Sequence, residues 1–151
     1  MPIKIEQEIV GYSVVSPSEV EPELPDTGEK LPRPSYLEGA TYKITPLNYG
    51  SMYLTVNDSV DEEGRHRPFE IFINMKGSED YAWIKTLSLV ISAIFRRRGN
   101  YEMVMDELED VVDPKGGYWI PRGDGHRVES VVAHIGYVLR QHCIRTGAIN
   151  E

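Results

Sequence analysis

The sequence predicts an α+β fold: a small antiparallel sheet with three helices packed on one face. Three segments, 42–45, 52–57 and 69–74, are rich in the β-branched and aromatic residues that favour strands. Two later segments, 78–99 and 127–145, repeat apolar residues at helical spacing, and a shorter segment between them does the same. Strands that come first and helices that follow are typical of a sheet with helices on one face, rather than of alternating βαβ units.

The first two predicted strands form a hairpin. Residues 46–50, which read Pro-Leu-Asn-Tyr-Gly, have the turn-forming composition that joins two strands. Residues 58–68 are polar and should form an exposed connection to the third strand. In the second and third strands large apolar residues alternate with their neighbours, so one row should face the core. That row is Met52, Leu54, Val56, Phe69, Ile71 and Ile73, whereas Glu70, Phe72 and Asn74 point the other way.

The first predicted helix has the clearest start and end signals. Ser78 supplies an N-cap oxygen, and Glu79 and Asp80 follow in the first turn, where the helix dipole favours negative charge. The helix closes with three consecutive arginines, which should neutralise the carbonyl groups at its negative end, and with Gly99 as a left-handed terminator. Its apolar face is expected to comprise Ile84, Leu87, Ile91, Ile94 and Phe95.

Two more helices are predicted after Gly99. Asn100 can cap the first of them, and Asp113-Pro114 stops it. Its apolar stripe is Val104, Leu108, Val111 and Val112. Gly116-Gly117 then introduces a short aromatic segment, where we expect a close backbone approach rather than a phosphate-binding loop. The last helix spans 127–145, and its inward residues are Val128, Val131, Val132, Ile135, Val138 and Leu139.

Charge and proline content divide the chain into three parts. Residues 1–39 contain six of the ten prolines and carry a net charge of −5, whereas residues 40–151 carry −3. We therefore expect an acidic Pro-rich arm or linker over 1–39, an α+β domain over 40–145 and a C-terminal tail over 146–151. Within the arm, the segment from Ile9 to Val15 has the composition of a short strand.

The composition excludes several classes of function. The longest apolar stretch, 87–95, is too short to span a membrane, and the N-terminus lacks the apolar core of a signal peptide, so a cytoplasmic location is expected. Cys143 is the only cysteine, which rules out an internal disulfide and zinc sites built on paired cysteines. The four histidines have no recognised ligand spacing, so we predict no metal site. A basic footprint for nucleic acid is absent apart from Arg96–Arg98, so nucleic acid is not an expected partner.

Several consecutive pieces of the sequence resemble one known family. They are LPRPSYLEGATYKI, SMYLTVND, RPFEIFINMKG, WIKTLSLVISAIFRRRG, MDELEDVVDPKGGYW and VESVVAHIGYVLRQH, which together span roughly 31–142. In this order they resemble the TSCPD domain, the C-terminal region of adenosylcobalamin-dependent (class II) ribonucleotide reductases. The cysteine-containing form of the motif that names the domain is absent, since Gly-His-Arg-Val-Glu-Ser occupies 125–130 before the last helix.

The resemblance implies a part in deoxyribonucleotide synthesis rather than catalysis by this chain alone. In the reductases a large barrel domain carries the radical chemistry; one cysteine pair is oxidised there and a further pair re-reduces the site. This chain has Cys143 alone and no barrel, so it is expected to be non-catalytic by itself. It is also expected to bind no cofactor of its own and to meet adenosylcobalamin only through a partner subunit.

Three hypotheses for the function follow. The first is a non-catalytic accessory or C-terminal component of a ribonucleoside-diphosphate reductase that docks on a separate catalytic subunit. The second is a regulatory or inhibitory binding protein, including one encoded by a virus, that keeps the fold and acts on a host protein through an acidic surface. The third is direct nucleotide binding by the sheet. The first two require a protein partner, and the sequence also allows a homo-oligomer.

The residues that match the family outside the apolar stripes are the candidate partner contacts. In the predicted topology they lie at strand ends and at the Gly-Gly turn, and the arginine triplet is the next candidate. Charge on Lys43, Arg67 and Glu70 would orient the partner. The alternative is that the asparagines and Asp58 shape turns and that the glycines only accommodate the backbone. The full set is Tyr42, Lys43, Asn57, Asp58, Arg67, Glu70, Asn74, Arg96, Arg97, Arg98, Gly116 and Gly117.

Overall fold

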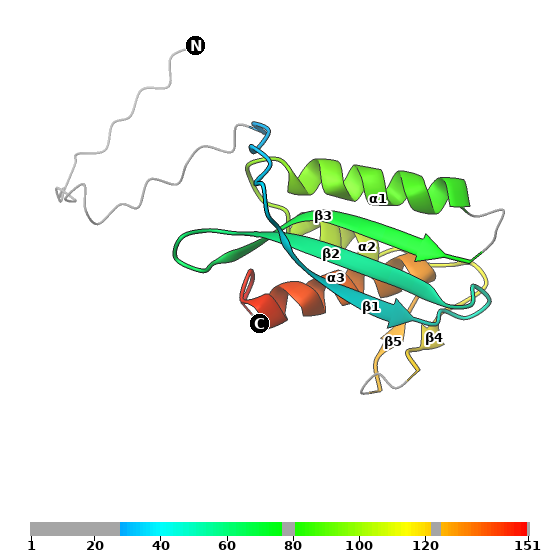
Figure 1. Ribbon diagram of the computed structural model, residues 1–151. Helices are drawn as coiled ribbons and strands as arrows, with labels where there is room; N and C mark the ends of the chain where they lie inside the picture. Colours follow the sequence, from blue (N-terminus) through cyan, green and yellow to red (C-terminus); the bar gives the residue numbers. More distant parts are fainter. Residues whose placement is uncertain (1–27, 77–80, 122–124, 151) are drawn as a thin grey trace, which may run out of the picture.

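An antiparallel sheet of three strands forms the centre of the fold in the computed structural model, which describes residues 28–76, 81–121 and 125–150. The strands are β1 (Glu38–Ile44), β2 (Met52–Val60) and β3 (His66–Met75), and β2 lies between the other two (Figure 1). The register places Leu54 opposite both Tyr42 and Ile73. Five residues of the predicted core row, Met52, Leu54, Val56, Ile71 and Ile73, are confirmed, because they belong to the core and are at most 5% exposed. The sixth, Phe69, is also buried but lies outside that core cluster.

A β-bulge interrupts the pairing of β2 with β3. Asn57 lies opposite Glu70 but Asp58 lies opposite Pro68, so Phe69 is an extra residue in β3. The side chains of Phe69 and Asp58 are both 1% exposed. At the bulge, β3 therefore buries the Phe69 ring and the neighbouring strand β2 buries the Asp58 carboxylate.

Helix α1 (Tyr81–Phe95) runs along the free edge of β3 (Figure 1). The Ser92 hydroxyl accepts a hydrogen bond from the Ile71 backbone N–H at 3.0 Å and donates one to the Ile71 carbonyl oxygen at 3.2 Å. One serine side chain thus satisfies both backbone groups that a further strand would otherwise pair with.

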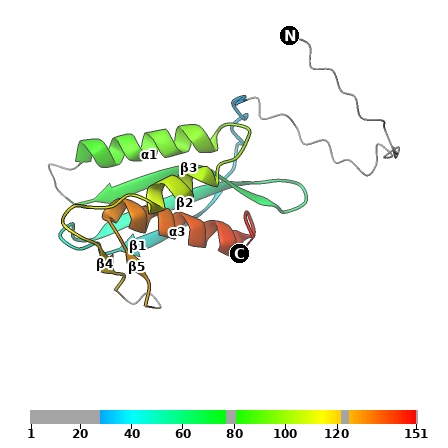
Figure 2. The same cartoon turned by 180° about the vertical axis from the view of Figure 1, so that it is seen from behind.

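Helices α2 (Met103–Glu109) and α3 (Val131–Thr146) pack against each other and cover one face of the sheet (Figures 1 and 2). Gly136 allows the close approach of the two helices, because a Cβ atom there would lie 2.8 Å from the Leu108 Cβ. Ser130 caps α3 by accepting a hydrogen bond from the Ala133 N–H at 2.9 Å, and Gly147 ends it in left-handed backbone. The predicted α+β class, with a small antiparallel sheet and three helices, is confirmed.

One hydrophobic core joins the sheet to all three helices. From α1 it takes Ile84, Ile91 and Phe95, each at most 2% exposed. Leu87 and Ile94 are only partly buried, and Ser88 and Ser92 occupy fully buried positions beside them. The core face of α1 is therefore rotated from the predicted one toward the two serines, because the helix packs against the edge of a strand and meets its polar backbone.

The end of α1 differs from the prediction. Ser78, Glu79 and Asp80 lie outside the described residues. The helix ends at Phe95, so the three arginines follow it instead of forming its last turn. Their side chains contact Glu70, the Gly28 carbonyl and Glu29 rather than the carbonyl groups of α1. Gly99 has a φ of 117°, as a glycine terminator allows.

The predicted second helix is shorter than its apolar pattern suggested. α2 ends at Glu109, and Val111 and Val112 beyond it are 39% and 64% exposed, so they are not part of a buried stripe. Asn100 does act near the start, since its Oδ1 accepts a hydrogen bond from the Glu102 N–H at 2.8 Å. The apolar contact with the core comes instead from Val104, Met105 and Leu108.

A two-stranded ribbon precedes α3. It consists of β4 (Tyr118–Trp119) and β5 (Arg127–Val128), so Val128 belongs to this ribbon and not to the last helix. A Cβ atom at Gly117 would lie 2.1 Å from the Val128 carbonyl oxygen. The glycine pair therefore marks a close backbone approach, as expected.

The chain enters the domain beside the end of α1. Leu31 N–H donates to the Arg96 carbonyl at 2.7 Å, Arg98 N–H donates to the Glu29 carbonyl at 2.9 Å, and Lys30 forms a β-bridge with Arg97. β1 starts at Glu38, next to the expected boundary between arm and domain. No described helix is both long and apolar enough to cross a membrane.

Candidate functional site

Five polar side chains meet where the sheet lies against the C-terminal half of α3. We call Tyr42, Asp58, His66, His142 and Arg145 the Asp58 network. His142 Nε2 lies 3.0 Å from both carboxylate oxygens of Asp58, and His66 Nδ1 lies 3.0 Å from Oδ2. The Tyr42 hydroxyl lies 2.7 Å from His142 Nδ1, and the Arg145 guanidinium donates to that hydroxyl. Asp58 and His142 are 1% and 2% exposed, so the centre of the network is fully buried.

The chemistry of these groups assigns the direction of several of the hydrogen bonds. Arg145 only donates, so the Tyr42 oxygen accepts from it. The histidines supply the donors for the Asp58 carboxyl group, His142 through Nε2 and His66 through Nδ1. Both nitrogens of His142 and both oxygens of Asp58 therefore have a partner within the network. The network therefore joins all three strands to α3.

Neither the phenol nor the nearby thiol is activated for nucleophilic chemistry. Burial raises the pKa of Tyr42, although the Arg145 charge opposes this, so the hydroxyl stays protonated near neutral pH. Cys143 is fully buried, and burial together with the Asp58 charge raises the pKa of its thiol to about 12. A cavity of about 150 Å³ borders the network. Cofactor and nucleotide sites usually occupy roughly 300 Å³ or more, so this cavity suits only a small polar molecule.

A second polar cluster surrounds Glu70 on the opposite face of the sheet. We call Arg33, Asn57, Glu70 and Arg96 the Glu70 cluster. Glu70 Oε1 accepts from Arg33 and from Asn57 at 3.1 Å each, and Oε2 accepts from Arg96 at 3.0 Å. The Glu70 residue is 4% exposed, so its charge is used within the fold. The cluster holds the entering segment and the end of α1 against β3.

Arg67 is also used within the fold. Its Nη2 donates to the Arg97 carbonyl at 2.6 Å, and its guanidinium lies 4.5 Å from the centre of the Tyr101 ring. Burial lowers the pKa of Arg67, with a further contribution from the Arg98 charge. The guanidinium thus packs as a flat platform between the ring and the backbone that follows α1.

The structure separates the predicted contact residues into several places. Tyr42 and Asp58 belong to the Asp58 network, Asn57, Glu70 and Arg96 belong to the Glu70 cluster, and Arg67, Arg97 and Arg98 lie beside that cluster. Gly116 and Gly117 precede β4 at the other end of the domain, and Gly116 borders a cavity of about 250 Å³. Lys43 and Asn74 are exposed on strands β1 and β3.

Sequence reasoning missed the histidines and two of the arginines. His66 and His142 were considered only as metal ligands, and Arg33 and Arg145 were not singled out. One signal was present, because Asp58 continues the buried phase of Met52, Leu54 and Val56. A carboxylate in that row requires buried partners, and a partner donor can be a histidine.

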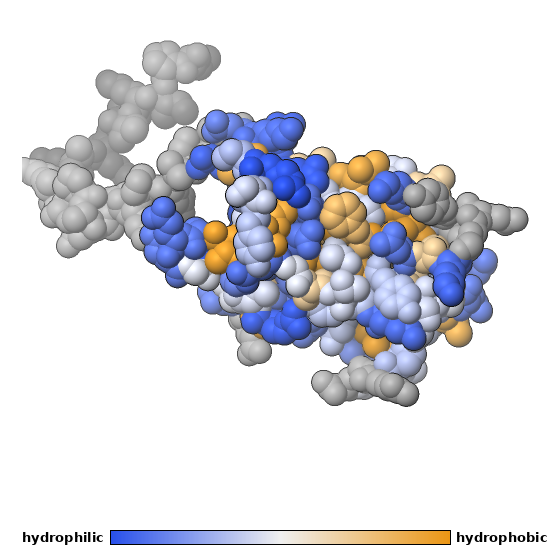
Figure 3. All heavy atoms as spheres, in the orientation of Figure 1, coloured by the Kyte–Doolittle hydropathy of each residue, from blue (hydrophilic) through white to orange (hydrophobic). Residues whose placement is uncertain are grey.

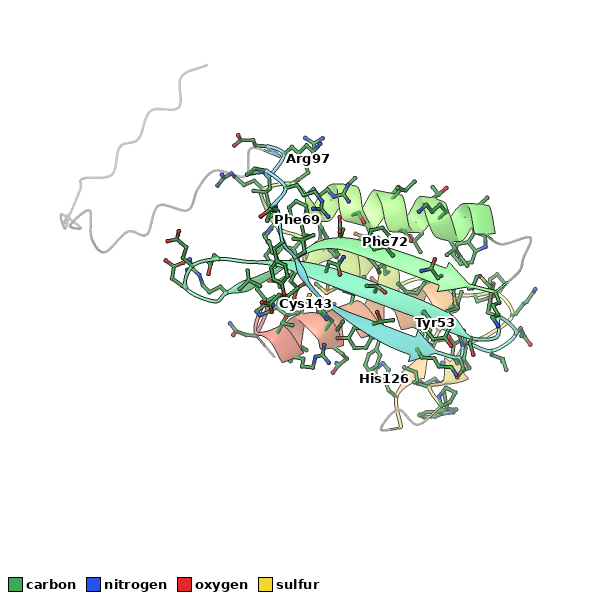
Figure 4. All side chains as sticks on the ribbon, viewed as in Figure 1. Tyr53, Phe69, Phe72, Arg97, His126 and Cys143 are labelled. Atoms are coloured by element: carbon green, nitrogen blue, oxygen red, sulfur yellow. The ribbon has the colours of Figure 1, made fainter. Side chains whose placement is uncertain are left out.

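The uncovered face of the sheet presents two aromatic side chains. Tyr53 and Phe72 are each 41% exposed and lie on neighbouring strands (Figure 4). The space-filling view of this face shows apolar surface over the sheet and along α1 among polar residues (Figure 3). Together with Lys43 and Asn74, these residues form what we call the outer face. Lys43 and Asn74 are predicted contact residues, and their exposed side chains belong to neither the Asp58 network nor the Glu70 cluster.

The described residues offer no group of three or more His, Cys, Asp or Glu side chains placed to hold a metal ion. The Asp58 network and the Glu70 cluster position the strands that present the outer face.

The comparisons with known proteins identify the family. No curated protein and no solved structure matches the sequence. The model of the TSCPD domain matches residues 24–143, which is most of the chain. The chain therefore belongs to the TSCPD domain family, and this domain is found in adenosylcobalamin-dependent ribonucleotide reductases.

Proposed function

We propose that this chain is a non-catalytic accessory component of a ribonucleoside-diphosphate reductase and docks on a separate catalytic subunit in deoxyribonucleotide synthesis. The observation that carries the proposal is the TSCPD match over residues 24–143 in a chain with one cysteine. The family relation supports the association with a reductase, and the cysteine content argues against independent reduction of a substrate.

The environment of Cys143 supports the non-catalytic part of the proposal. A thiol that exchanges electrons with a substrate or with another thiol must reach it as a thiolate. Cys143 has no exposed surface and a pKa raised to about 12. Any adenosylcobalamin and any redox-active thiols would therefore belong to the partner.

The outer face is the docking surface that we propose for the catalytic subunit. Antiparallel sheets commonly turn a polar face to water, whereas this face exposes Tyr53 and Phe72, and aromatic residues are enriched in protein interfaces. Lys43 is exposed beside them and would orient an acidic patch of the catalytic subunit. Arg67 and Glu70, which were expected to share this role, are used by the fold itself.

The proposal is tested by measuring the binding of the full chain to the purified catalytic subunit of an adenosylcobalamin-dependent reductase from the same source. Titration calorimetry should show binding of the wild-type chain and a loss of at least about tenfold in affinity for Phe72→Glu, because a carboxylate would be buried unpaired. Val112→Glu is the matched control, since Val112 is also an exposed apolar residue but follows α2 on the helix side. Absence of wild-type binding would overturn the proposed function and favour a regulatory protein with another target.

A further inference from the structure

Among the described residues, none pairs with the outer edge of β1. Ile71 directs its N–H and C=O away from β2, toward Ser92, so its opposite residue Val56 directs its own groups toward β1. Alternation then turns the backbone groups of Ala40 toward β2 and those of Thr41 and Lys43 outward. Within residues 28–76, 81–121 and 125–150, no segment pairs with this edge.

A groove follows the open edge of β1. It has a volume of about 370 Å³ and runs between residues 41–45 of β1 and its following turn, Ile120-Pro121 after β4, and one side of α3. The α3 wall consists of His134, Tyr137 and Val138. The Tyr137 ring stacks on His126 with 4.1 Å between ring centres, so this wall is held in place. The groove thus combines the outward backbone groups of β1 with apolar contacts from Ile120, Pro121 and Val138.

The N-terminal arm contains a segment whose sequence fits this groove. Residues 9–15 read Ile-Val-Gly-Tyr-Ser-Val-Val, and they lie outside the described residues. Val10, Tyr12 and Val14 alternate with Gly11 and Ser13, which is the pattern of a strand with one apolar face. Residues 16–27, which follow it, are dominated by proline and acidic residues and offer no second segment of this kind.

We propose that residues 9–15 of the same chain pair antiparallel with the outer edge of β1, as a fourth strand of the sheet. The side chains of Ala40 and Tyr42 point to the core side, so Tyr12 opposite Tyr42 would enter the groove, whereas Val14 opposite Ala40 would lie just beyond its end. Ser13 then lies opposite Thr41 and Gly11 opposite Lys43, and each pair exchanges two backbone hydrogen bonds. Added strands bind in this way, with affinity from the main chain and specificity from alternate side chains.

The connecting chain is long enough for this pairing. Twelve residues, 16–27, join the segment to Gly28, and they can extend over about 40 Å. β1 has seven residues and is about 23 Å long. The tether also keeps the segment at a high effective concentration near the edge, so a modest intrinsic affinity is sufficient.

Disulfide trapping in the full chain tests the pairing. Ser13→Cys with Thr41→Cys should form an intramolecular disulfide in oxidised glutathione, because opposite residues of such a pair have Cα atoms about 5.5 Å apart. Ser13→Cys with Phe72→Cys is the matched control, since Phe72 is exposed two strands away. Native Cys143 is fully buried and does not compete. Equal yields for both variants, or a disulfide between two chains in place of one within the chain, would overturn the proposal.

Hydrogen exchange supplies a second readout that needs no cysteine. The amide protons of Thr41 and Lys43 should exchange slowly in the wild-type chain, and Tyr12→Asp should speed them at least about tenfold by placing a carboxylate in the apolar groove. Leu24→Asp, in the arm but outside the segment, should leave both rates unchanged. Fast exchange of both amides in the wild-type chain would refute the fourth strand.

Discussion

The two edge strands of the sheet, β3 and β1, differ in whether their outward backbone groups have hydrogen-bond partners among the described residues. At the β3 edge α1 lies alongside the strand, and Ser92 satisfies both backbone groups of Ile71. At the β1 edge the backbone groups of Thr41 and Lys43 face a groove, with no described segment paired to them. Unpaired edges invite pairing with other chains, and proteins usually cover or blunt them. Within the described residues, one edge is therefore closed by α1, whereas the other has room for an added strand.

Each of the two polar clusters supports a different edge of the sheet. The Glu70 cluster ties the end of α1 and the entering segment to β3, and so supports the closed edge. The Asp58 network ties β1, β2 and β3 to α3, and so fixes the open edge without covering it. A rigid, uncovered strand is a better template for an added strand than a mobile one, because less conformational entropy is lost on binding.

The largest expected effect comes from breaking the closed edge at its apolar contact. Ile91→Ala should lower the free energy of unfolding by about 2–5 kcal/mol, because it leaves a cavity between α1 and the sheet. Ile91 is 2% exposed, whereas its neighbour Val90 is 52% exposed, so Val90→Ala is the matched control with little change. Denaturant unfolding monitored by circular dichroism measures both. Equal losses would mean that α1 contributes through its helical content and not through this contact.

The pH dependence of the free energy of unfolding tests the role of His134, which lies in the α3 wall of the groove beside β1. Burial lowers the pKa of His134 to about 4, and the Tyr118 hydroxyl lies 2.9 Å from its Nδ1. Because the folded-state pKa lies below the unfolded value of about 6.5, neutral His134 contributes to the free energy of unfolding. This contribution is present above pH 6.5 and is lost as the pH falls toward 4. The free energy of unfolding should fall by about 2 kcal/mol between pH 6.5 and pH 4.5. His134→Gln, which keeps an acceptor without titrating, should flatten that part of the profile, and an unchanged slope would contradict the assignment.

Comparing two buried serines of α1 distinguishes the effect of the hydrogen bonds to the β3 edge from the effect of burying a serine. Ser92→Ala removes both hydrogen bonds to Ile71 and should lower the free energy of unfolding by about 1–3 kcal/mol. Ser88 is equally buried, but its hydroxyl donates to the Ile84 carbonyl of the same helix at 3.2 Å. Ser88→Ala should therefore have a smaller effect, since that carbonyl belongs to an intact helix. If the two alanine variants lose the same free energy of unfolding, the hydrogen bonds from Ser92 to Ile71 contribute nothing measurable.

The sequence predicted those parts of the molecule that follow from local patterns. The alternation of Met52, Leu54 and Val56 identified the core face of β2, and the spacing of Ile84, Ile91 and Phe95 identified α1. It did not separate Leu87 from Ser88, because which side of a helix is buried depends on whether it packs on a face or on an edge. Val111 and Val112 continued an apolar pattern after the helix had ended.

The candidate site was harder to predict than the fold. Asp58 and His142 are 84 positions apart and meet only because α3 crosses behind the strands. Glu70 was expected to face a partner, since it points away from the core row, but Arg33 from the entering segment and Arg96 from beyond α1 enclose it. Such pairings depend on tertiary contacts between distant segments, and local sequence patterns contain no record of them.

The smallest expected effect comes from proline substitution along β1, and it sharpens the comparison most directly. Lys43 directs its N–H outward, so Lys43→Pro removes no hydrogen bond to β2 and should cost less than about 1 kcal/mol in a chain that lacks residues 9–15. Ala40 directs its N–H toward Val56, so Ala40→Pro should cost about 3 kcal/mol. In the full chain Lys43→Pro should also speed hydrogen exchange at Thr41, because the added strand would lose one of its bonds. Equal destabilisation by the two prolines would show that the outward groups of β1 already have a partner within the domain, and the two edges would then be alike.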